Sequence, residues 1–365
     1  MIIIIGAGIA GLTLANYLQR SGKLYVVLEA AEKLTEVGAG ILLQNNSLAI
    51  LRQLSLEHLL DGELIDHMAM GYHSAHGTVN IKQLGMEAVC VHRAVLQSAL
   101  LANIPDTHIK LSSVITHVEI QAHGVTVKLA NGETISGAYA VNCAGINSDL
   151  HAKPIITSTQ LWCWRAIVSL NEPINTFREH WFDEQRIGFG PISQTQAYLF
   201  HVVDERTINS AHYSDKQRQA WILSKIPEVP DLSAINFAET VWLSHPLQER
   251  DINWGHGRFI AIGDAAHAMT PNLGQGAAIA MEDGAVLAQL FIENPADVLA
   301  SLVKKRDKRV ANMKLKSLYV GKVAHSQQPV MRALKWITFR YLPFKPALKS
   351  QLTWINAFVH SIKGN

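Results

Sequence analysis

The most constraining feature of the sequence is a glycine-rich turn that directly follows a short apolar run. Residues 2–5 are four isoleucines, and Gly6, Gly8 and Gly11 then take the spacing GxGxxG ahead of an Ala- and Leu-rich stretch. The apolar run predicts a buried strand, and the stretch after the turn predicts a helix. A second apolar run at residues 24–28 completes a strand–helix–strand unit of the kind that binds dinucleotides.

Each glycine of this turn has a physical purpose in nucleotide binding. The first turns tightly, the second lets a pyrophosphate approach the backbone, and the third permits close helix packing, while the helix N-terminus faces the phosphates. Glu29 ends the next strand, where an acid accepts hydrogen bonds from ribose hydroxyls and repels the extra phosphate of NADP. The unit therefore predicts a site for FAD or NAD.

A second long motif lies far away in the sequence. Residues 263–276 read GDAAHAMTPNLGQG, after an apolar run at 258–262 and before a helix that begins near Gly276. The strand delivers Asp264, whose carboxylate can accept hydrogen bonds from a sugar-alcohol chain, and the loop presents backbone N–H groups ahead of a helix. A reduced flavin is an anion that such a loop stabilises, because the helix dipole is positive there.

The composition excludes several other classes of protein. Cys90, Cys143 and Cys163 show no paired spacing, so neither a disulfide framework nor a metal site is predicted, and a reducing cytoplasm is the expected compartment. No apolar stretch approaches the roughly 20 residues of a membrane-spanning helix, and residues 1–5 lack the flanks of a secretory signal. No motif for nucleic-acid binding is present.

Taken together, these motifs resemble the single-component FAD-dependent aromatic-ring hydroxylases, a group that includes para-hydroxybenzoate, salicylate and urate hydroxylases and zeaxanthin epoxidase. The most specific element is GDAAHAMTPNLGQGAAIAMEDG at residues 263–284, supported by GAGIAGL at 6–12, VGAGI at 37–41, Arg93 at a helix start and WRA at 164–166. The resemblance implies one FAD, held by Gly6, Gly8, Ala10, Gly11, Glu29, Ala30, Gly40, Gln44, Arg93, Gly263, Asp264, Gly274, Gln275, Gly276 and Ala277. Without the resemblance, Arg93 is a solvated charge at a helix start.

The resemblance also implies the fold: an α/β protein with a discontinuous Rossmann-like FAD-binding domain, an inserted mixed β-sheet substrate domain and a helical C-terminal region. Alternating residues around an Asn-Gly turn at 131–132 predict a β-meander between 113 and 140, and helices are expected near 47–60 and 91–101. The expected division is 1–70, 91–153 and 251–300 for the FAD-binding domain, 71–90 and 154–250 for the substrate domain, and 301–365 for the basic helical C-terminal region.

For the reaction, the resemblance implies that NADH or NADPH reduces FAD, that O2 forms a flavin hydroperoxide near Pro271, and that one oxygen atom enters a small, largely apolar or aromatic substrate. One segment departs from the family pattern. Members usually carry a GADG-type segment and then an Arg, whereas residues 142–148 read NCAGINS and His151 stands at the Arg position. The electron donor, whether NADH, NADPH or an external reduced flavin, therefore stays open.

The substrate pocket is expected on the inserted sheet, where alternate residues of a strand share a face. Arg165 could hold a carboxylate and His201 could deprotonate a phenol, although either could equally be structural. These two, Tyr198 and Pro271 are the predicted catalytic residues, and the wider set of pocket candidates is Trp164, Arg165, Phe189, Tyr198, Phe200 and His201. His267 is interpreted as a packing residue of its loop, and His73 and His76 as surface or core residues.

The C-terminal region carries most of the positive charge. From Lys304 onward there are 14 Lys and Arg against Asp307 alone, which leaves a net charge of about −11 for the rest of a chain whose total is +2. Basic residues mixed with aromatics predict a helical tail that caps the FAD-binding domain through its aromatics while lysines face solvent. The alternative is an amphipathic segment at the inner face of an anionic membrane. The basic residues are Arg332, Lys335, Arg340, Lys345 and Lys349. A monomer or a homodimer is expected.

Other functions share this architecture and stay open at this point. A flavin-dependent halogenase is one, although residues 162–165, WCWR, do not match the usual halogenase motif. An isoprenoid reductase is another, and a non-catalytic flavin-binding protein is a third.

Overall fold

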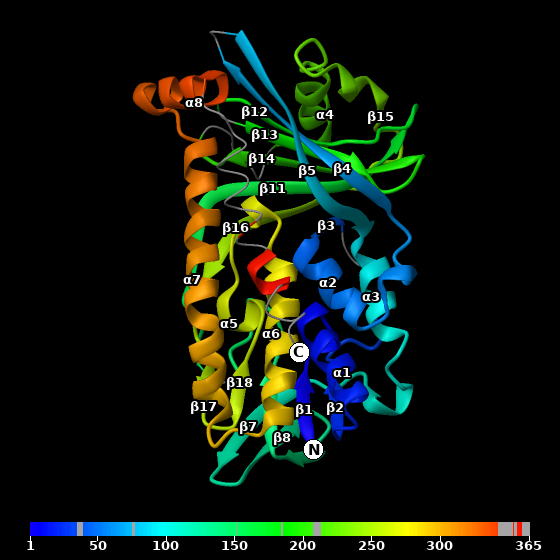
Figure 1. The fold of residues 1–365 in the computed structure, drawn as a ribbon, viewed down its shortest axis with the longest axis vertical. Helices are drawn as coiled ribbons and strands as arrows, with labels where there is room; N and C mark the ends of the chain where they lie inside the picture. Colours follow the sequence, from blue (N-terminus) through cyan, green and yellow to red (C-terminus); the bar gives the residue numbers. More distant parts are fainter. Residues whose placement is uncertain are drawn as a thin grey trace.

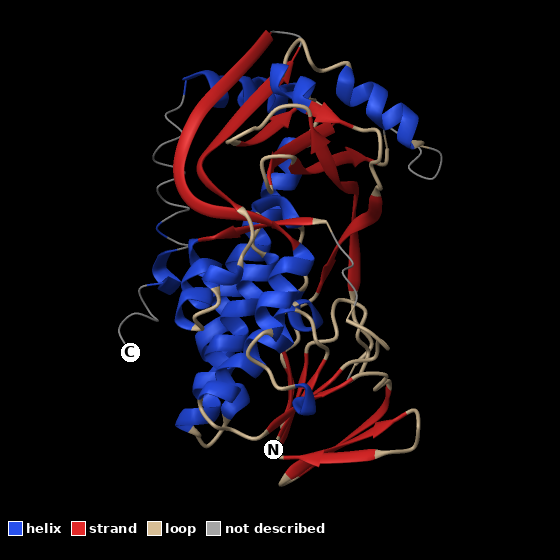
Figure 2. Cartoon of the chain, turned by 90° about the vertical axis from the view of Figure 1, so that its right-hand side faces the viewer, coloured by secondary structure: helices blue, strands red, loops and turns tan. Residues whose placement is uncertain are grey.

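The computed structural model describes residues 1–34, 39–74, 77–150, 152–183, 185–206, 213–341, 353 and 356–359, with the side chains of 66, 67 and 80–86 left aside. The described chain forms a lower half of helices on a sheet and an upper half built on a larger sheet (Figure 1). Figure 2 shows the same order from the side, with a small three-stranded meander at the base. This is the α/β architecture that the sequence predicts.

The lower half is organised around a six-stranded sheet whose order is β17-β18-β10-β1-β2-β6. All pairings except that of β17 are parallel. Parallel strands buried on both faces read as continuous apolar runs, which explains the four isoleucines of β1. The strands are β1 (Ile2–Ile5), β2 (Tyr25–Leu28), β6 (Ile109–Lys110), β10 (Tyr139–Asn142), β17 (Gly255–His256) and β18 (Phe259–Ala261).

Helices cover one face of this sheet and the meander covers the other. The helices share one apolar core with the sheet, and α1 packs directly on α6. The described helices here are α1 (Ile9–Arg20), α2 (Asn45–Gln53), α3 (Arg93–Leu101), α5 (Asp264–His267), α6 (Gly276–Glu293) and α7 (Val298–Ala324). The meander, β7 (Ile115–Gln121), β8 (Gly124–Leu129) and β9 (Thr134–Gly137), packs on the opposite face, as predicted.

The upper half is a nine-stranded mixed sheet in the order β15-β11-β14-β13-β12-β4-β5-β3, with β16 paired to β11. β12 and β4 are parallel, and the other pairs are antiparallel. α4 (Asp215–Leu223) packs on one face. The strands are β3 (Gly40–Gln44), β4 (Glu63–Ser74), β5 (Gly77–His92), β11 (Ile156–Leu170), β12 (Phe177–Trp181), β13 (Gln185–Pro191), β14 (Gln196–Asp204), β15 (Ile235–Asn236) and β16 (Leu243–Arg250).

Three details differ from the sequence-based expectations, two of them because strands take residues that looked helical or lay before a boundary. The helix expected from residue 91 begins at Arg93, since β5 continues to His92, whose Nδ1 accepts a hydrogen bond from Ala94 N at 3.2 Å. The helix expected over 47–60 ends at Gln53. β4 enters the upper sheet at Glu63, before the boundary proposed at residue 71. We keep the division into domains as a proposal.

The C-terminal region consists of two helices in the part of the chain that is described to residue 341. α7 runs along one side of the molecule, and α8 (Pro329–Tyr341) turns across the upper sheet (Figure 1). Among the described residues we find no helix with the length and apolar character needed to cross a bilayer. The predicted basic residues Lys345 and Lys349 lie outside the described chain.

Candidate active site

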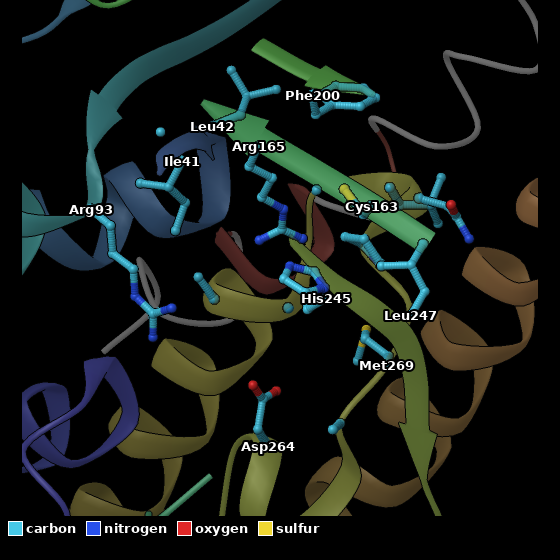
Figure 3. Close-up of a pocket in the computed structure, with 18 of the residues that line it drawn as sticks. Ile41, Leu42, Arg93, Cys163, Arg165, Phe200, His245, Leu247, Asp264 and Met269 are labelled. Atoms are coloured by element: carbon cyan, nitrogen blue, oxygen red, sulfur yellow. The ribbon is translucent and has the colours of Figure 1, made fainter. Parts of the chain in front are cut away.

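A cavity of about 850 Å³ lies between the two halves, a volume typical of small-molecule and cofactor sites. Its lower wall contains residues of the two glycine-rich motifs, and its upper wall belongs to the nine-stranded sheet. Figure 3 shows Arg165 reaching down from the upper sheet with His245 beside it, and Asp264 pointing up from below. The cavity therefore joins the predicted cofactor residues to the predicted substrate sheet.

The first glycine-rich turn, between β1 and α1, forms one part of the lower wall. A Cβ on Gly11 would lie 2.1 Å from the Gly6 carbonyl oxygen, so only glycine lets the helix approach this closely. Gly8 is different, because a Cβ there would meet nothing within 4 Å, and Gly8 lines the cavity. Glu29 holds the turn from behind, since its Oε2 accepts a hydrogen bond from Ala7 N at 2.7 Å.

The second motif forms the facing part of the lower wall. Asp264 follows β18 and is exposed to the cavity, while Gly274, with φ of +62°, turns the chain into α6. A Cβ on Gly276 would again meet nothing within 4 Å. Gln44 ties the loop to β3 by donating from Nε2 to the Leu273 carbonyl at 3.0 Å.

Residues 142–148, the segment that departs from the family pattern, follow β10 and form a third loop of the cavity wall. Asn142 Oδ1 accepts hydrogen bonds from Ala144 N at 3.1 Å and from Ser148 Oγ at 3.0 Å. A Cβ on Gly145 would meet nothing within 4 Å, and Ile146 and Asn147 also line the cavity. His151 lies outside the described residues.

These three loops fit an FAD molecule. Gly8, Gly145 and Gly276 all face open space where a side chain would intrude, which is the surface that a closely bound cofactor requires. The N-termini of α1 and α6 lie at the same cavity, and helix N-termini favour pyrophosphate and anionic ring groups. Asp264 supplies a carboxylate to accept hydrogen bonds from hydroxyl groups.

The upper wall combines a large apolar surface with a few polar side chains. The apolar members include Met68, Met70, Phe177, Trp181, Phe200, Val202 and Leu247. The polar members include Arg165, Glu179, Arg186, Tyr198 and His245. Such a wall can bind a mostly apolar ring system while a small number of polar groups fix its orientation.

The comparison with protein families agrees with this geometry. A family model described as "FAD binding domain" matches residues 1–310, which is most of the chain. The chain belongs to the FAD binding domain family.

Curated relatives of this FAD binding domain protein are monooxygenases. It is 28% identical to the 2-heptyl-3-hydroxy-4(1H)-quinolone synthase of Pseudomonas aeruginosa, over 94% of each chain. It is 28% identical to the aurachin C monooxygenase/isomerase of Stigmatella aurantiaca, over 85% of each. It is 27% identical to the 6-hydroxynicotinate 3-monooxygenase of Pseudomonas fluorescens, over 80% of this chain and 82% of the relative.

Solved structures support the fold. Klebsiella pneumoniae HpxO, determined with FAD and uric acid, superposes with a TM-score of 0.82 at 22% identity and covers 97% of this chain and 96% of its own. The prediction of an FAD-dependent monooxygenase with a Rossmann-like fold is thus confirmed for family, cofactor and reaction class. The protein is an FAD-dependent monooxygenase that acts on a small molecule.

Within this FAD binding domain protein, the predicted cofactor residues divide into two groups. Those that line the cavity are Gly8, Ala10, Gly40, Gln44, Arg93, Asp264, Gly274, Gly276 and Ala277. The others, Gly6, Gly11, Glu29, Ala30, Gly263 and Gln275, do not line it. Gln275 turns its side chain into the core, where Oε1 accepts from Asn46 Nδ2 at 2.9 Å. Val37 and Gly38 of the VGAGI match lie outside the described residues.

The alternation of strands sorts the predicted pocket residues. Arg165, Tyr198 and Phe200 face the cavity, and Pro271 lines it from the loop below. Trp164, Phe189 and His201 do not line the cavity, because they occupy the alternate positions of β11, β13 and β14.

The prediction that His201 acts as a catalytic base is therefore wrong, because its ring does not face the cavity. The ring is fully buried, its Nε2 shares a hydrogen bond with Gln185 Oε1 at 2.7 Å, and it stacks on Trp221 with 4.7 Å between ring centroids. Burial, with the charge of Arg218, lowers the pKa of His201 to about 3, so the ring stays neutral. His201 is a core residue.

Arg165 and His245 are the polar pair nearest the centre of the upper wall. The Nε of Arg165 has no hydrogen-bond partner among the described residues. Burial lowers the pKa of His245, and the neighbouring charge of Arg165 lowers it further. Burial raises the pKa of Tyr198 against the opposing charge of Arg165, so the phenol keeps its proton. Gly40 leaves room for this ring, because a Cβ on it would lie 2.3 Å from Tyr198 Cβ.

The sequence analysis missed a group of buried polar side chains in the upper wall that includes Arg186 and Glu179. Arg186 Nη2 donates to Asn272 Oδ1 at 2.7 Å, and Arg186 Nη1 lies 3.3 Å from Glu179 Oε1, an ion pair without hydrogen-bond geometry. Trp181 Nε1 donates to the same carboxylate oxygen at 2.7 Å. Arg186 in the otherwise uncharged β13 was the available signal. His245 was also missed, since nothing in sequence ties it to Arg165.

His267 lies away from the cavity, as interpreted from the sequence. Its Nε2 shares a hydrogen bond of 2.6 Å with Asp283 Oδ2, and both side chains are buried. His73 is buried as well, whereas His76 lies outside the described residues. Among the residues that the structure describes, no three His, Cys, Asp or Glu side chains gather in a way that could hold a metal ion.

Proposed function

We propose that this monooxygenase hydroxylates a flat heteroaromatic compound that carries an apolar substituent. The proposal rests on the composition of the upper wall, where Arg165 and His245 lie beside an apolar surface that includes Met68, Met70 and Leu247. The names of two relatives support the proposal, since one is a synthase of a heptyl-substituted quinolone and another a hydroxynicotinate monooxygenase. The alkyl chain of such a substrate would lie along the apolar surface.

The residues of the cavity would bind and orient the substrate. Bound FAD supplies the redox chemistry that activates O2 for transfer of one oxygen atom. Arg165 is placed to hold an oxygen that carries negative charge, and the Tyr198 hydroxyl remains a donor. Pro271 and the apolar surface exclude water from the centre of the cavity. These roles, and the cofactor contacts named above, are proposals.

The proposed substrate class can be tested by comparing the turnover of two candidate substrates. The holoenzyme would be supplied with 2-heptyl-4(1H)-quinolone and, separately, with 6-hydroxynicotinate, and product formation would be followed by mass spectrometry. We expect hydroxylation of the alkylated quinolone and little of the smaller acid. Turnover of 6-hydroxynicotinate alone would contradict the proposal.

His245 is our candidate for the base that removes a proton from the substrate. Its Nδ1 lies 3.4 Å from the Pro246 carbonyl oxygen, so the Nδ1–H tautomer leaves Nε2 able to accept a proton. Because its pKa is lowered below the ordinary value of about 6.5, kcat/KM should be flat above pH 7 and fall as the pH drops through that lowered pKa. His245→Gln should lose about 100-fold in kcat and the acid limb. An acid limb that survives in His245→Gln would exclude this role.

We propose NADH or NADPH as the electron donor. The altered 142–148 segment still presents a loop to the cavity, held by Asn142. Anaerobic mixing of the holoenzyme with each nicotinamide should bleach the flavin absorbance with at least one of them. If neither bleaches it while dithionite does, an external reduced flavin replaces the nicotinamides as the proposed donor.

We further propose that α8 lies on an anionic membrane surface at the inner face of the membrane, as part of a cytoplasmic protein. Its inner face packs on the upper sheet through Phe339, and its outer face exposes an apolar row at helical spacing. The row is Val330, Leu334, Ile337 and Tyr341, which are 72%, 48%, 49% and 72% exposed. α8 contains no acidic residue, Arg340 is exposed in its last turn, and Lys322 is exposed near the end of α7. Of the other predicted basic residues, Arg332 pairs with Asp183, and Lys335 is buried, so neither faces the membrane. Such a face suits the interface of an anionic bilayer.

Co-sedimentation with vesicles tests this contact. The protein should pellet with vesicles containing phosphatidylglycerol and much less with pure phosphatidylcholine, and Leu334→Glu with Ile337→Glu should abolish pelleting. Leu24→Glu, at a 73% exposed position directly before β2, is the matched control. β2 lies in the lower half, away from α8 (Figure 1). Equal pelleting of the double variant would contradict the contact. Sedimentation of the protein alone reports whether it is a monomer or a homodimer.

A further inference from the structure

Two cations, a buried arginine and a partly buried lysine, lie behind the loops of the cavity, and both donate to backbone carbonyls. Arg250, at the end of β16, is 1% exposed and donates from Nη1 to the Ile146 carbonyl at 2.9 Å and the Ser148 carbonyl at 2.7 Å. Within the described part of the chain, no carboxylate forms an ion pair with it. Its guanidinium thus closes the loop that presents Gly145 to the cavity.

Lys314 connects this arginine to the second cavity loop. From α7, its Nζ donates to the Arg250 carbonyl at 2.7 Å and to the Ala268 carbonyl at 2.9 Å. Arg250 N also donates to Ala268 O at 3.0 Å. Ala268, Met269 and Pro271 line the cavity. A continuous chain of hydrogen bonds therefore runs from α7 through Arg250 to the 145–148 loop.

We propose that Lys314 and Arg250 act together as a clamp of positioning residues, which fixes the 145–148 loop against the 268–271 loop and places positive potential behind the cofactor. The 142–148 segment is held at its two ends by different side chains. Asn142 caps only the start of that segment, through Ala144 N and Ser148 Oγ. The far side of the segment depends on Arg250.

Holding these carbonyls with cations costs desolvation free energy, which another contribution must offset. A neutral donor could satisfy the same carbonyls, whereas a buried charge loses its hydration. Burial lowers the pKa of Lys314, but the carboxylates of Glu249, Asp251 and Asp264 favour the charged form. Lys314 Nζ lies 2.9 Å from the carbonyl oxygen of Ala268, which lines the cavity, so the positive charge lies directly behind the cavity wall. A positive potential there would favour reduced, anionic flavin.

Geometry and charge can be separated by substitution. Lys314→Met keeps the length and removes the charge, and Lys314→Arg keeps the charge. Arg250→Lys keeps the charge but is shorter and lacks the planar guanidinium whose Nη1 donates to the carbonyls of Ile146 and Ser148. Lys308→Met is the matched control, because Lys308 is exposed on the same helix. The two readouts are deuterium uptake of peptides spanning 143–149 and 266–273, with and without FAD, and the midpoint reduction potential of bound FAD.

We expect Lys314→Met to speed exchange about ten-fold in both peptides and to lower the flavin potential. The effect on 143–149 would be indirect, because the hydrogen bonds of Lys314 go to the second loop and to Arg250. Lys314→Arg should restore the potential, and Arg250→Lys should loosen 143–149 while the potential stays near that of the wild type. Lys308→Met should change neither readout. Faster exchange confined to 266–273 in Lys314→Met would overturn the clamp, and an unchanged potential would overturn its electrostatic part. If Lys314→Met does not fold, Arg250→Lys still decides the clamp, since unchanged exchange in 143–149 overturns it.

Discussion

Gly8→Leu should yield a folded protein that no longer holds FAD. A Cβ at this position meets nothing within 4 Å, so the new side chain enters the cofactor space without touching the protein. Its cost to the α1 N-terminus should be about 1 kcal/mol, whereas FAD affinity should fall at least about 100-fold because the pyrophosphate must approach this backbone. Flavin fluorescence titration measures the affinity and circular dichroism the fold.

Gly11→Ala provides the contrasting variant in the same turn. Its Cβ would lie 2.1 Å from the Gly6 carbonyl oxygen, so this substitution should impair folding itself. Gly276→Leu should behave like Gly8→Leu, since Gly276 also faces open space at the other motif. Wild-type FAD affinity in both leucine variants would show that the cofactor does not lie between the two motifs.

The second large expected effect is a loss of stability when a buried charge between α6 and α7 is removed. Asp283 accepts hydrogen bonds from Arg306 Nε at 2.7 Å, from His267 Nε2 at 2.6 Å and from Gly263 N at 3.0 Å, and it is fully buried. Asp283→Ala leaves Arg306 partly unpaired in the core, which should lower the free energy of unfolding by about 3–5 kcal/mol. Urea denaturation measures this change.

The control for Asp283 is Glu293→Ala on the same helix. Glu293 is exposed and its oxygen lies 3.9 Å from Lys305 Nζ, so its loss should cost less than about 1 kcal/mol. Burial alone would raise the pKa of Asp283, but His267 and Arg306 lower it below its ordinary value. Its contribution should therefore be complete above pH ~4 and be lost as the pH falls further. Equal effects of the two substitutions would contradict this account.

The lower half of the fold was largely predictable because its signals are local. Glycines at fixed spacing between an apolar run and a helical stretch define the β1–α1 turn without knowledge of any distant contact. The second motif carried the same kind of information, and α6 begins at Gly276 as expected. The meander followed from alternation and from its Asn-Gly turn.

The upper half was harder to predict because its pocket depends on which face of each strand meets the cavity. Alternation shows that Trp164 and Arg165 point to opposite faces of β11, but sequence does not say which face is covered by α4. The structure buries His201 on the α4 side and turns Arg165 to the cavity. His245 joins Arg165 only because β16 pairs with β11.

The C-terminal charge also needed the structure for its interpretation. A count of basic residues suggested one electrostatic region, yet Arg306 and Lys314 point inward and bond to groups of the FAD-binding half. These contacts join α7 to that half, whereas α8 packs on the upper sheet. The partner carboxylate of Arg306 lies more than twenty residues earlier, at Asp283, so no local pattern reveals the pairing.

The central claim is that one FAD lies across both glycine-rich motifs of a single chain. Native mass spectrometry of the protein purified without added cofactor, followed by acid release and identification of the bound molecule, tests it most directly. The account predicts one FAD for each 365-residue chain. A protein that neither carries FAD nor takes it up on reconstitution, or that binds a different cofactor, would contradict it.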